Sequence, residues 1–169
     1  MTFFNSTKIL EGNTLLLRKI YEDDFDGILK AMSDPEIWAG HPKKDRYEVH
    51  AIREWFANAL EEDALVIINK EKNEIIGSSR YYETDIDKNE TSIGYTFLTT
   101  NYWGGETNRE LKELMFRHAW KHFDTVWLHI GEDNIRSRKA AEKIGAKLEY
   151  TGTKYGLAYC WYLLPKGSI

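Results

Sequence analysis

The chain has 169 residues, about the length of one domain, and we predict a single domain over residues 1–169. Its 42% hydrophobic and 14% aromatic content excludes a disordered chain, because that much apolar surface can form a core. A net charge of -4 argues against nucleic acid as a partner, since phosphate binding needs a basic excess. No apolar run approaches the roughly 18 residues of a membrane span, and residues 1–13 lack the pattern of a secretory signal. We therefore expect a cytoplasmic protein without a membrane partner.

The first half of the chain alternates between strand and helix periodicity. Residues 13–20 predict a strand, and residues 22–34 predict a short helix that opens with acidic side chains. Residues 46–62 predict a second helix. Three further strands are predicted at residues 64–69, 74–83 and 91–98, with polar turns between them, and an antiparallel meander is their simplest arrangement.

The second half begins with the most regular helical pattern of the chain. Apolar and histidine side chains recur at steps of three and four residues over 106–123, which predicts a helix. A strand at 125–131, a short helix at 134–146 that ends near Gly145, and two strands at 147–155 and 157–164 complete the order. We predict an α/β fold with one mixed sheet, about seven strands and four helices. The lone Cys160 excludes an internal disulfide.

Two adjacent glycines stand at the junction between the strand at 91–98 and the helix that follows it. The first backbone N–H groups of a helix have no partner within the helix, and glycine lets the backbone approach a phosphate closely. The sequence Trp103-Gly104-Gly105 therefore indicates an anion-binding turn. A tight turn that only needs a positive φ explains the two glycines equally well.

Three stretches of the sequence together resemble one family. The motifs SIGYTFL, YWGG..NRELK.LM..HA and N.RSRKA.EKIGA, with their spacing, are similar to the GNAT superfamily of acyl-CoA-dependent N-acyltransferases. Within it, the chain is most similar to the branch that contains the ribosomal-protein N-terminal acetyltransferases. The resemblance is specific from Ile93 to Lys147 and weak over residues 1–60. It implies acetyl-CoA as the cosubstrate, and a central parallel pair of strands, 91–98 and 125–131, that splay apart.

The resemblance also implies which residues bind acetyl-CoA. The end of the strand at 91–98 would line the pantetheine arm, and the glycine turn would hold the pyrophosphate. Asn134 matches a residue that contacts pantetheine, and Arg136 and Arg138 could reach phosphates unless they form a solvated helix face. The implied cofactor-binding residues are Phe97, Leu98, Thr99, Trp103, Gly104, Gly105, Thr107, Asn108, Asn134, Arg136, Ser137 and Arg138.

Several positions depart from the family pattern. Glu106 occupies the place of a loop glycine, where its carboxylate would repel a pyrophosphate unless the side chain turns away or caps the helix. Ala141 occupies the place of the tyrosine that many members use as the acid. These departures keep two alternatives to an enzyme open, a non-catalytic acyl-CoA-binding module and a purely structural domain.

The implied reaction is direct attack of a primary amine, on a small molecule or a peptide N-terminus, on the thioester of acetyl-CoA. Ser137 is the candidate acid toward the leaving thiolate, and a helix cap is its alternative role. The branch often places a glutamate where this chain has Ser92, and Glu90 on the same strand face could act as base through water. Glu83 and His129 are weaker candidates for the base.

Two loops, at residues 33–47 and 155–159, are expected to bind the acceptor. Acidic side chains in the first loop could attract a cationic amine, and the candidate acceptor-binding residues are Asp34, Glu36, Trp38 and Tyr155. His118 and His122 lie one helical turn apart, but they lack the glutamate of zinc peptidases and a third ligand, so we expect no metal. The oligomeric state, monomer or homodimer, is left open.

Overall fold

The computed structural model describes residues 8–169, and the chain divides into two compact units. Unit 1 comprises the residues up to Arg80 together with Tyr95–Leu114, and unit 2 comprises Tyr81–Gly94 and Met115–Ile169. The strands form one mixed sheet in the order β1-β2-β3-β4-β5-β6-β8-β7. The predicted mixed α/β class is confirmed, and the prediction of one domain over residues 1–169 stays a prediction. The expectation of no secretory signal rests partly on residues 1–7, which lie outside the described residues.

The element bounds agree with the predicted ranges to within a few residues. The strands are β1 (Ile9–Glu11), β2 (Leu15–Lys19), β3 (Leu65–Asn69), β4 (Glu74–Asp85), β5 (Glu90–Leu98), β6 (Thr125–Gly131), β7 (Lys147–Lys154) and β8 (Leu157–Leu163). The helices are α1 (Phe25–Met32), α2 (Pro35–Trp38), α3 (Val49–Glu61), α4 (Thr107–Ala119) and α5 (Ile135–Lys143), with 3-10 turns η1 (Glu22–Asp24) and η2 (Thr100–Tyr102). None of these helices, in the part of the chain described, is long and apolar enough to span a membrane.

The predicted counts of seven strands and four helices were wrong, because two short elements were missed. β1 has three residues and pairs antiparallel with β2, so it is too short to show an alternating pattern. α2 has four residues and begins at a local signal, Pro35 at its first position and the Asp34 carboxylate accepting from the Glu36 amide at 2.9 Å. Elements of this length depend on capping and pairing rather than on periodicity.

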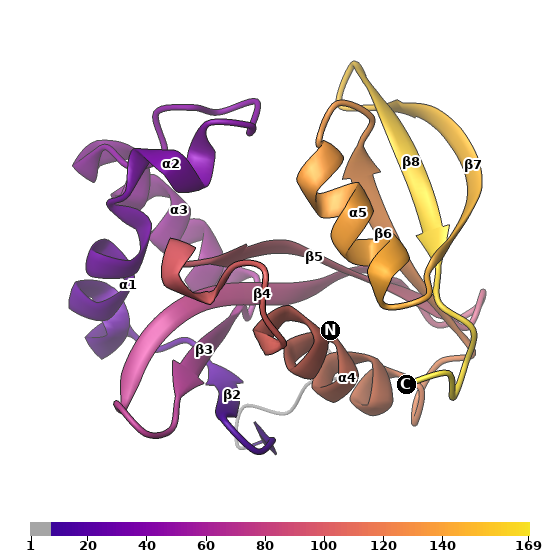
Figure 1. Ribbon diagram of the computed structural model, residues 1–169, viewed down its shortest axis with the longest axis horizontal. Helices are drawn as coiled ribbons and strands as arrows, with labels where there is room; N and C mark the ends of the chain where they lie inside the picture. Colours follow the sequence, from indigo (N-terminus) through magenta and orange to yellow (C-terminus); the bar gives the residue numbers. More distant parts are fainter. Residues whose placement is uncertain (1–7) are drawn as a thin grey trace. The chain divides into compact units, whose positions relative to one another are not determined.

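Unit 1 is built on the antiparallel strands β1 to β4. Its helices α1, α2 and α3 group beside these strands (Figure 1), and their apolar side chains form a common core with β2, β3 and β5. This core includes Ile28, Met32, Ile52, Trp55 and Val66, all less than one-tenth exposed. Burial of this aromatic and aliphatic surface is the main stabilising contribution in unit 1.

Unit 2 contains the parallel strand pair that the resemblance implied. β5 pairs with β6 through Glu90–Ser92 and Thr125–Trp127, which confirms the parallel arrangement, while the predicted splay beyond this register stays a prediction. β6 pairs antiparallel with β8, and β8 pairs antiparallel with β7. β7 and β8 form the orange-to-yellow hairpin of Figure 1. α5 contacts β6, and the rings of Tyr150 and Trp161 stack at 4.9 Å between centroids across the hairpin.

Candidate functional site

The glycine turn of unit 1 is exposed and open. η2 leads into it, and the Trp103 indole N–H donates to the carbonyl of Leu98 at 2.9 Å, which fixes the turn against the end of β5. Gly104 has a φ of 72°, a conformation that favours glycine. A Cβ added at Gly104 or Gly105 would meet no atom within 4 Å, so the turn leaves free space at both positions. The positive φ of Gly104 is therefore explained by a tight turn alone, and the turn also leaves room for a ligand.

Helix α4 starts directly after this turn, with Thr107 and Asn108 in its first turn. The amide of Glu110 donates to the carbonyl of Glu106 at 2.9 Å, so the helical ladder begins there. The first amides of a helix and its dipole together favour an anion. The Glu106 side chain is exposed and forms no hydrogen bond or ion pair with any residue in 8–169, so its predicted capping bond is not present there.

The end of β5 carries the residues that the resemblance assigns to the pantetheine arm. Phe97 and Leu98 are buried, and the Phe97 ring contacts Trp38 and Trp55 with centroids 5.3 and 5.8 Å apart. The amide of Thr99 donates to the carbonyl of Ile76 in β4 at 2.8 Å. These side chains therefore anchor the strand in the core of unit 1, and a ligand would meet mainly its backbone.

Helix α5 of unit 2 begins at a side-chain cap. Asn134 is the N-cap residue, and its Oδ1 accepts from the Ser137 amide at 3.3 Å. The Ser137 hydroxyl is half-buried and forms no hydrogen bond within the described chain, so the cap uses the backbone of Ser137 and leaves its Oγ available. The alternative role of Ser137 as the cap is therefore filled by Asn134.

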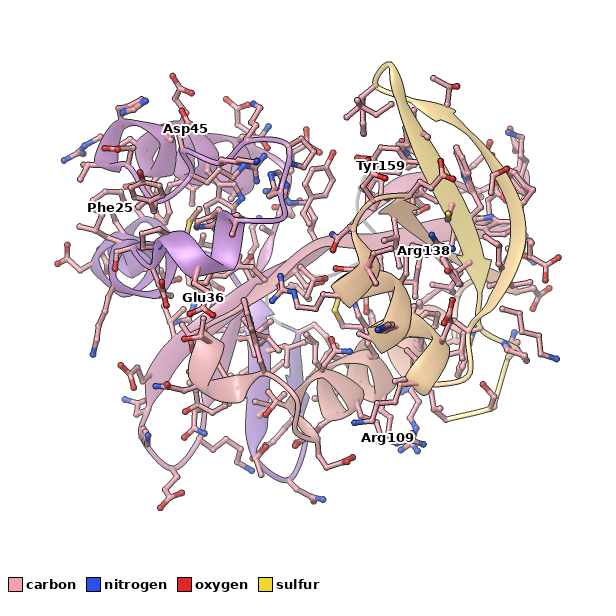
Figure 2. The ribbon with its side chains drawn as sticks, turned by 45° about the horizontal axis from the view of Figure 1, so that its top comes forward. Phe25, Glu36, Asp45, Arg109, Arg138 and Tyr159 are labelled. Carbon is pink, nitrogen blue, oxygen red and sulfur yellow. The ribbon has the colours of Figure 1, made fainter. Side chains whose placement is uncertain are left out.

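The two arginines of α5 differ in their surroundings. Arg138 extends from α5 toward β8 (Figure 2), where its Nε donates to the Tyr162 hydroxyl at 3.1 Å and its Nη1 donates to the carbonyl of Glu132 at 3.0 Å. The hydrogen bond to Tyr162 raises the pKa of Arg138. Arg136 is exposed. Arg138 thus stabilises unit 2, and only part of its guanidinium is left for a phosphate.

His129 is the centre of a polar network in unit 2. Its Nδ1 accepts a hydrogen bond from Lys154 Nζ at 2.8 Å and lies 3.0 Å from the Tyr82 hydroxyl, while its Nε2 lies 3.4 Å from Ser92 Oγ. Burial, together with the charge of Lys154, lowers the pKa of His129 to about 4. Lys154 in turn forms a short ion pair with Glu83. An ammonium can only donate, so Nδ1 is the acceptor and Nε2 carries the proton. His129 is a poor base because its basic nitrogen, Nδ1, already accepts from Lys154 and its pKa is low.

Two other candidates for the base, Glu90 and Ser92, lie on β5. Ser92 is buried, and its hydroxyl lies 3.4 Å from His129 Nε2, so its contact is with the histidine rather than with a substrate amine. Glu90 is half-buried, and one of its carboxylate oxygens accepts from the Trp127 indole at 3.0 Å. The second oxygen has no hydrogen bond among residues 8–169. Of the two predicted positions, Glu90 is the one with a free acceptor.

The predicted acceptor residues have different environments. Asp34 accepts from Glu36 N and from Thr100 Oγ1 at 3.2 Å, so its carboxylate already serves the fold. Trp38 is buried, with its indole N–H donating to the carbonyl of Met32. Glu36 is exposed. In unit 2, Tyr155 is 67% exposed in the turn between β7 and β8, with a φ of 54°. Asp34 and Trp38 are therefore mainly structural, which leaves Glu36 and Tyr155 as accessible members of the set.

The histidine pair formed by His118 at the end of α4 and His122 in the turn after it is not an evident metal site. The rings of His118 and His122 have centroids 5.3 Å apart, and His118 packs against the ring of Tyr81. No group of three or more possible metal ligands occurs in the described part of the chain. The absence of a metal requirement stays a prediction.

Two buried cations and one half-buried cation were missed by the sequence analysis. Lys154 belongs to the His129 network, and Lys112 on α4 donates to Thr96 Oγ1 at 3.1 Å, where burial lowers its pKa to about 8. Arg80 on β4 is 2% exposed. For Arg80, the signal in the sequence was a charged residue in a strand segment whose other residues are uncharged, IIGSSRYY.

Comparisons with known proteins agree on one family. A family model described as an acetyltransferase (GNAT) domain matches residues 14–147, whereas no curated protein sequence matches the chain. A GCN5-related N-acetyltransferase from Brucella melitensis has a similar fold, with a TM-score of 0.85 and 16% identity over 95% of this chain and 80% of that one. The ribosomal-protein-S5-alanine acetyltransferase of Vibrio fischeri gives 0.69 and 14%, over 95% and 97% of the two chains. The spermidine N-acetyltransferase of Vibrio cholerae, solved with CoA and spermine, gives 0.70 and 12%, over 93% and 98%.

Proposed function

Since the chain belongs to the acetyltransferase (GNAT) domain family, we propose that it is an acetyl-CoA-dependent N-acetyltransferase that acts on a primary amine. The match over residues 14–147 is the observation that carries this proposal. A small molecule and a peptide N-terminus are both possible classes of acceptor. A cytoplasmic location and the oligomeric state stay predictions.

Binding of acetyl-CoA is assigned to residues whose backbone is available. The open turn at Gly104 and Gly105 and the first amides of α4 would hold the pyrophosphate, because unpaired N–H groups and the helix dipole both favour negative charge. The backbone at the end of β5 would contact the pantetheine arm, and Asn134 and Arg136 would add polar contacts. None of these contacts needs a metal.

The proposed reaction is one acyl transfer without an acyl-enzyme. The neutral amine attacks the thioester carbonyl carbon and forms the new C–N bond, and the C–S bond then breaks. The departing thiolate takes a proton from the Ser137 hydroxyl, whose Oγ is available, and the ammonium formed on attack loses its proton through water to Glu90. Water carries that proton from Glu90 back to Ser137 Oγ, so that the hydroxyl and the carboxylate are both restored. The products are the N-acetylated amine and CoA.

The experiment is a thiol-release assay with acetyl-CoA and a panel of primary amines, with the acetylated product identified by mass spectrometry. We expect CoA release that depends on the amine and that a chelator leaves unchanged. Calorimetric binding of CoA without thiol release for any amine would instead support the acyl-CoA-binding module, which the exposed Glu106 and the alanine at 141 favour. No CoA binding at all would support a structural domain.

A further inference from the structure

Arg80 is a buried cation whose hydrogen bonds are incomplete. It lies on β4 in unit 1 and is 2% exposed. Its Nη1 donates to Asn58 Oδ1 at 2.8 Å, but its Nε is buried and has no hydrogen-bond partner among residues 8–169. A buried donor without a partner costs stability, and the cost is greater when the group is charged. An arginine in this state needs an explanation.

Aromatic rings surround the guanidinium and supply no acceptor along its edge. The central carbon of Arg80 lies 4.6 Å from the centroid of the Tyr95 ring and 5.7 Å from that of Trp55. Tyr95 is 43% exposed and has a φ of 52° within β5, so a locally distorted strand turns this ring toward solvent. Cation–π contacts compensate part of the lost hydration of the cation. They leave the Nε–H, which lies in the plane of the guanidinium, for another partner.

A second arginine, Arg46, belongs to the same cluster. It is half-buried in the segment between α2 and α3, with its central carbon 5.7 Å from the centroid of a Trp38 ring. Burial lowers the pKa of both arginines, and the charge of Arg46 lowers that of Arg80 further, so the two like charges lie close enough to repel. Both remain protonated at neutral pH, since the ordinary arginine pKa is far higher.

No carboxylate of the described chain pairs with either arginine. The charge of Asp45 acts on Arg46 and that of Glu62 acts on Arg80 without a hydrogen bond or ion pair. The same unit does pair an arginine where the fold requires it, because Arg18 binds Asp24 through two hydrogen bonds of 2.8 Å. The pair Arg46 and Arg80 therefore differs from a structural ion pair.

We propose that Arg46, Arg80 and Tyr95, the arginine cluster of unit 1, bind a carboxylate of the acceptor, so that the substrate is an amine that also carries a carboxylate group. This inference rests on the proposed acetyltransferase function. A carboxylate matches the planar fork of a guanidinium and would satisfy the unpaired Nε of Arg80. It differs from the expectation of a cationic acceptor, which stays a prediction for Glu36, whereas the Asp34 carboxylate is occupied by the cap of α2 and by Thr100.

The test compares acceptors that differ only in the charge at the far end. The three amines 4-aminobutyrate, n-butylamine and putrescine share a primary amine on a four-carbon chain and end in a carboxylate, a methyl group and an ammonium. We expect kcat/KM to be highest for 4-aminobutyrate and lowest for putrescine. Equal or higher kcat/KM for putrescine would overturn the proposal. A preference for 3-aminopropylphosphonate over 4-aminobutyrate would overturn the assignment to a carboxylate.

Single substitutions test whether the preference for a carboxylate-bearing acceptor comes from the arginine cluster. Arg80→Met and, separately, Arg46→Met should lower the ratio of kcat/KM for 4-aminobutyrate to that for n-butylamine by roughly 10-fold to 100-fold, the range expected for charge-assisted hydrogen bonds. Arg53→Met is the matched control, because Arg53 is exposed on α3 in the same unit and lies over the Phe25 ring at 4.9 Å. An unchanged ratio in both cluster variants would refute the assignment, whereas a general loss of stability would lower both rates together.

Calorimetry separates this proposal from the proposed function. Titration of 4-aminobutyrate into the protein with CoA present measures carboxylate binding without any turnover. If no amine is acetylated but 4-aminobutyrate binds and Arg80→Met abolishes that binding, the enzyme assignment fails and the arginine cluster stands. If amines are acetylated with no preference for the carboxylate, and 4-aminobutyrate binds no more tightly than n-butylamine, the enzyme assignment stands and the cluster proposal fails.

Discussion

Arg80 in unit 1 and Lys154 in unit 2 are both cations held away from water, but their partners differ. Lys154 donates to His129 and pairs with Glu83, so the charge is balanced by the chain itself. Arg80 is contacted by two aromatic rings and by one amide oxygen, that of Asn58, and its Nε has no hydrogen-bond partner among residues 8–169. The difference teaches that a buried charge indicates a ligand only when the surrounding chain leaves its donors unused.

A similar contrast between paired and unpaired polar groups exists within unit 2, where most of the polar groups described above are hydrogen-bonded to one another. Tyr162 links Arg138 to Glu142, since it accepts from Arg138 and donates to the Glu142 carboxylate at 2.9 Å. The Ser137 hydroxyl and one oxygen of Glu90 are exceptions. Substitution of a side chain whose polar atoms are all hydrogen-bonded should therefore change stability or pKa. Substitution of Ser137 or Glu90 should change catalysis.

The largest expected effect is on Ser137. Ser137→Ala should lower kcat by about 100-fold, because the lost hydroxyl is assigned to protonation of the leaving thiolate in the transition state. The melting temperature and the CoA affinity should be nearly unchanged, since Asn134 caps α5 through the Ser137 amide, which alanine retains. Single-turnover kinetics and calorimetry measure these quantities. A wild-type kcat, under conditions where chemistry limits the rate, would show that the proton reaches the thiolate through water.

The next effect concerns Glu90. Glu90→Gln should lower kcat by about tenfold, less than for Ser137, because a base that acts through water is less closely coupled to the reacting amine. The amide oxygen of glutamine can still accept from the Trp127 indole, so the free energy of unfolding should hold constant. The pH dependence of kcat/KM supplies the readout, and its acidic limb should change in the variant. An unaltered profile would remove Glu90 from the mechanism.

A smaller effect is expected for the pKa of His129. Its folded-state pKa of about 4 lies below the ordinary 6.5, so the unfolded chain binds the proton first and stability falls as the pH drops from about 6.5 to 4. Lys154→Gln keeps a donor toward Nδ1 but removes a positive charge, so the pKa of His129 should rise and that pH dependence should become shallower.

His41 is the internal control for this titration. Its pKa is also lowered to about 4, by burial and by Arg46, but it belongs to unit 1. NMR titration of both imidazoles in the Lys154→Gln protein should show a shift for His129 only. Equal shifts of both histidines would mean a general change of structure rather than a local electrostatic one.

The smallest effect is expected at the glycine turn. Glu106→Gly should tighten CoA binding by a few fold if its carboxylate repels the pyrophosphate, and the gain should shrink at high salt because screening weakens the repulsion. Glu106→Gln is the matched variant that removes the charge and keeps the side-chain size. Calorimetry at two salt concentrations measures the CoA affinity of each variant. Unchanged or weaker affinity in both variants would count against repulsion.

The sequence predicted long elements well and missed short ones. The strand at 125–131 matches β6 in both bounds, because its apolar pattern and flanking turns are all local. β1 depends on pairing with β2, and α2 depends on the Asp34 cap, so neither leaves a periodic signal. Ser137 and the glycine turn could be found from motif spacing. The arginine cluster could not, because it is assembled from segments about 34 and 15 residues apart in the chain, Arg46 to Arg80 and Arg80 to Tyr95.

The buried Arg80 also has a consequence for protein engineering. Replacing a buried charge with an apolar side chain of similar volume is often neutral or stabilising. A thermostability screen on the ligand-free protein would therefore favour methionine or leucine at position 80, and the same variants would lose the group that we assign to the acceptor carboxylate. Position 80 should thus be held fixed whenever the protein is stabilised for use as a catalyst.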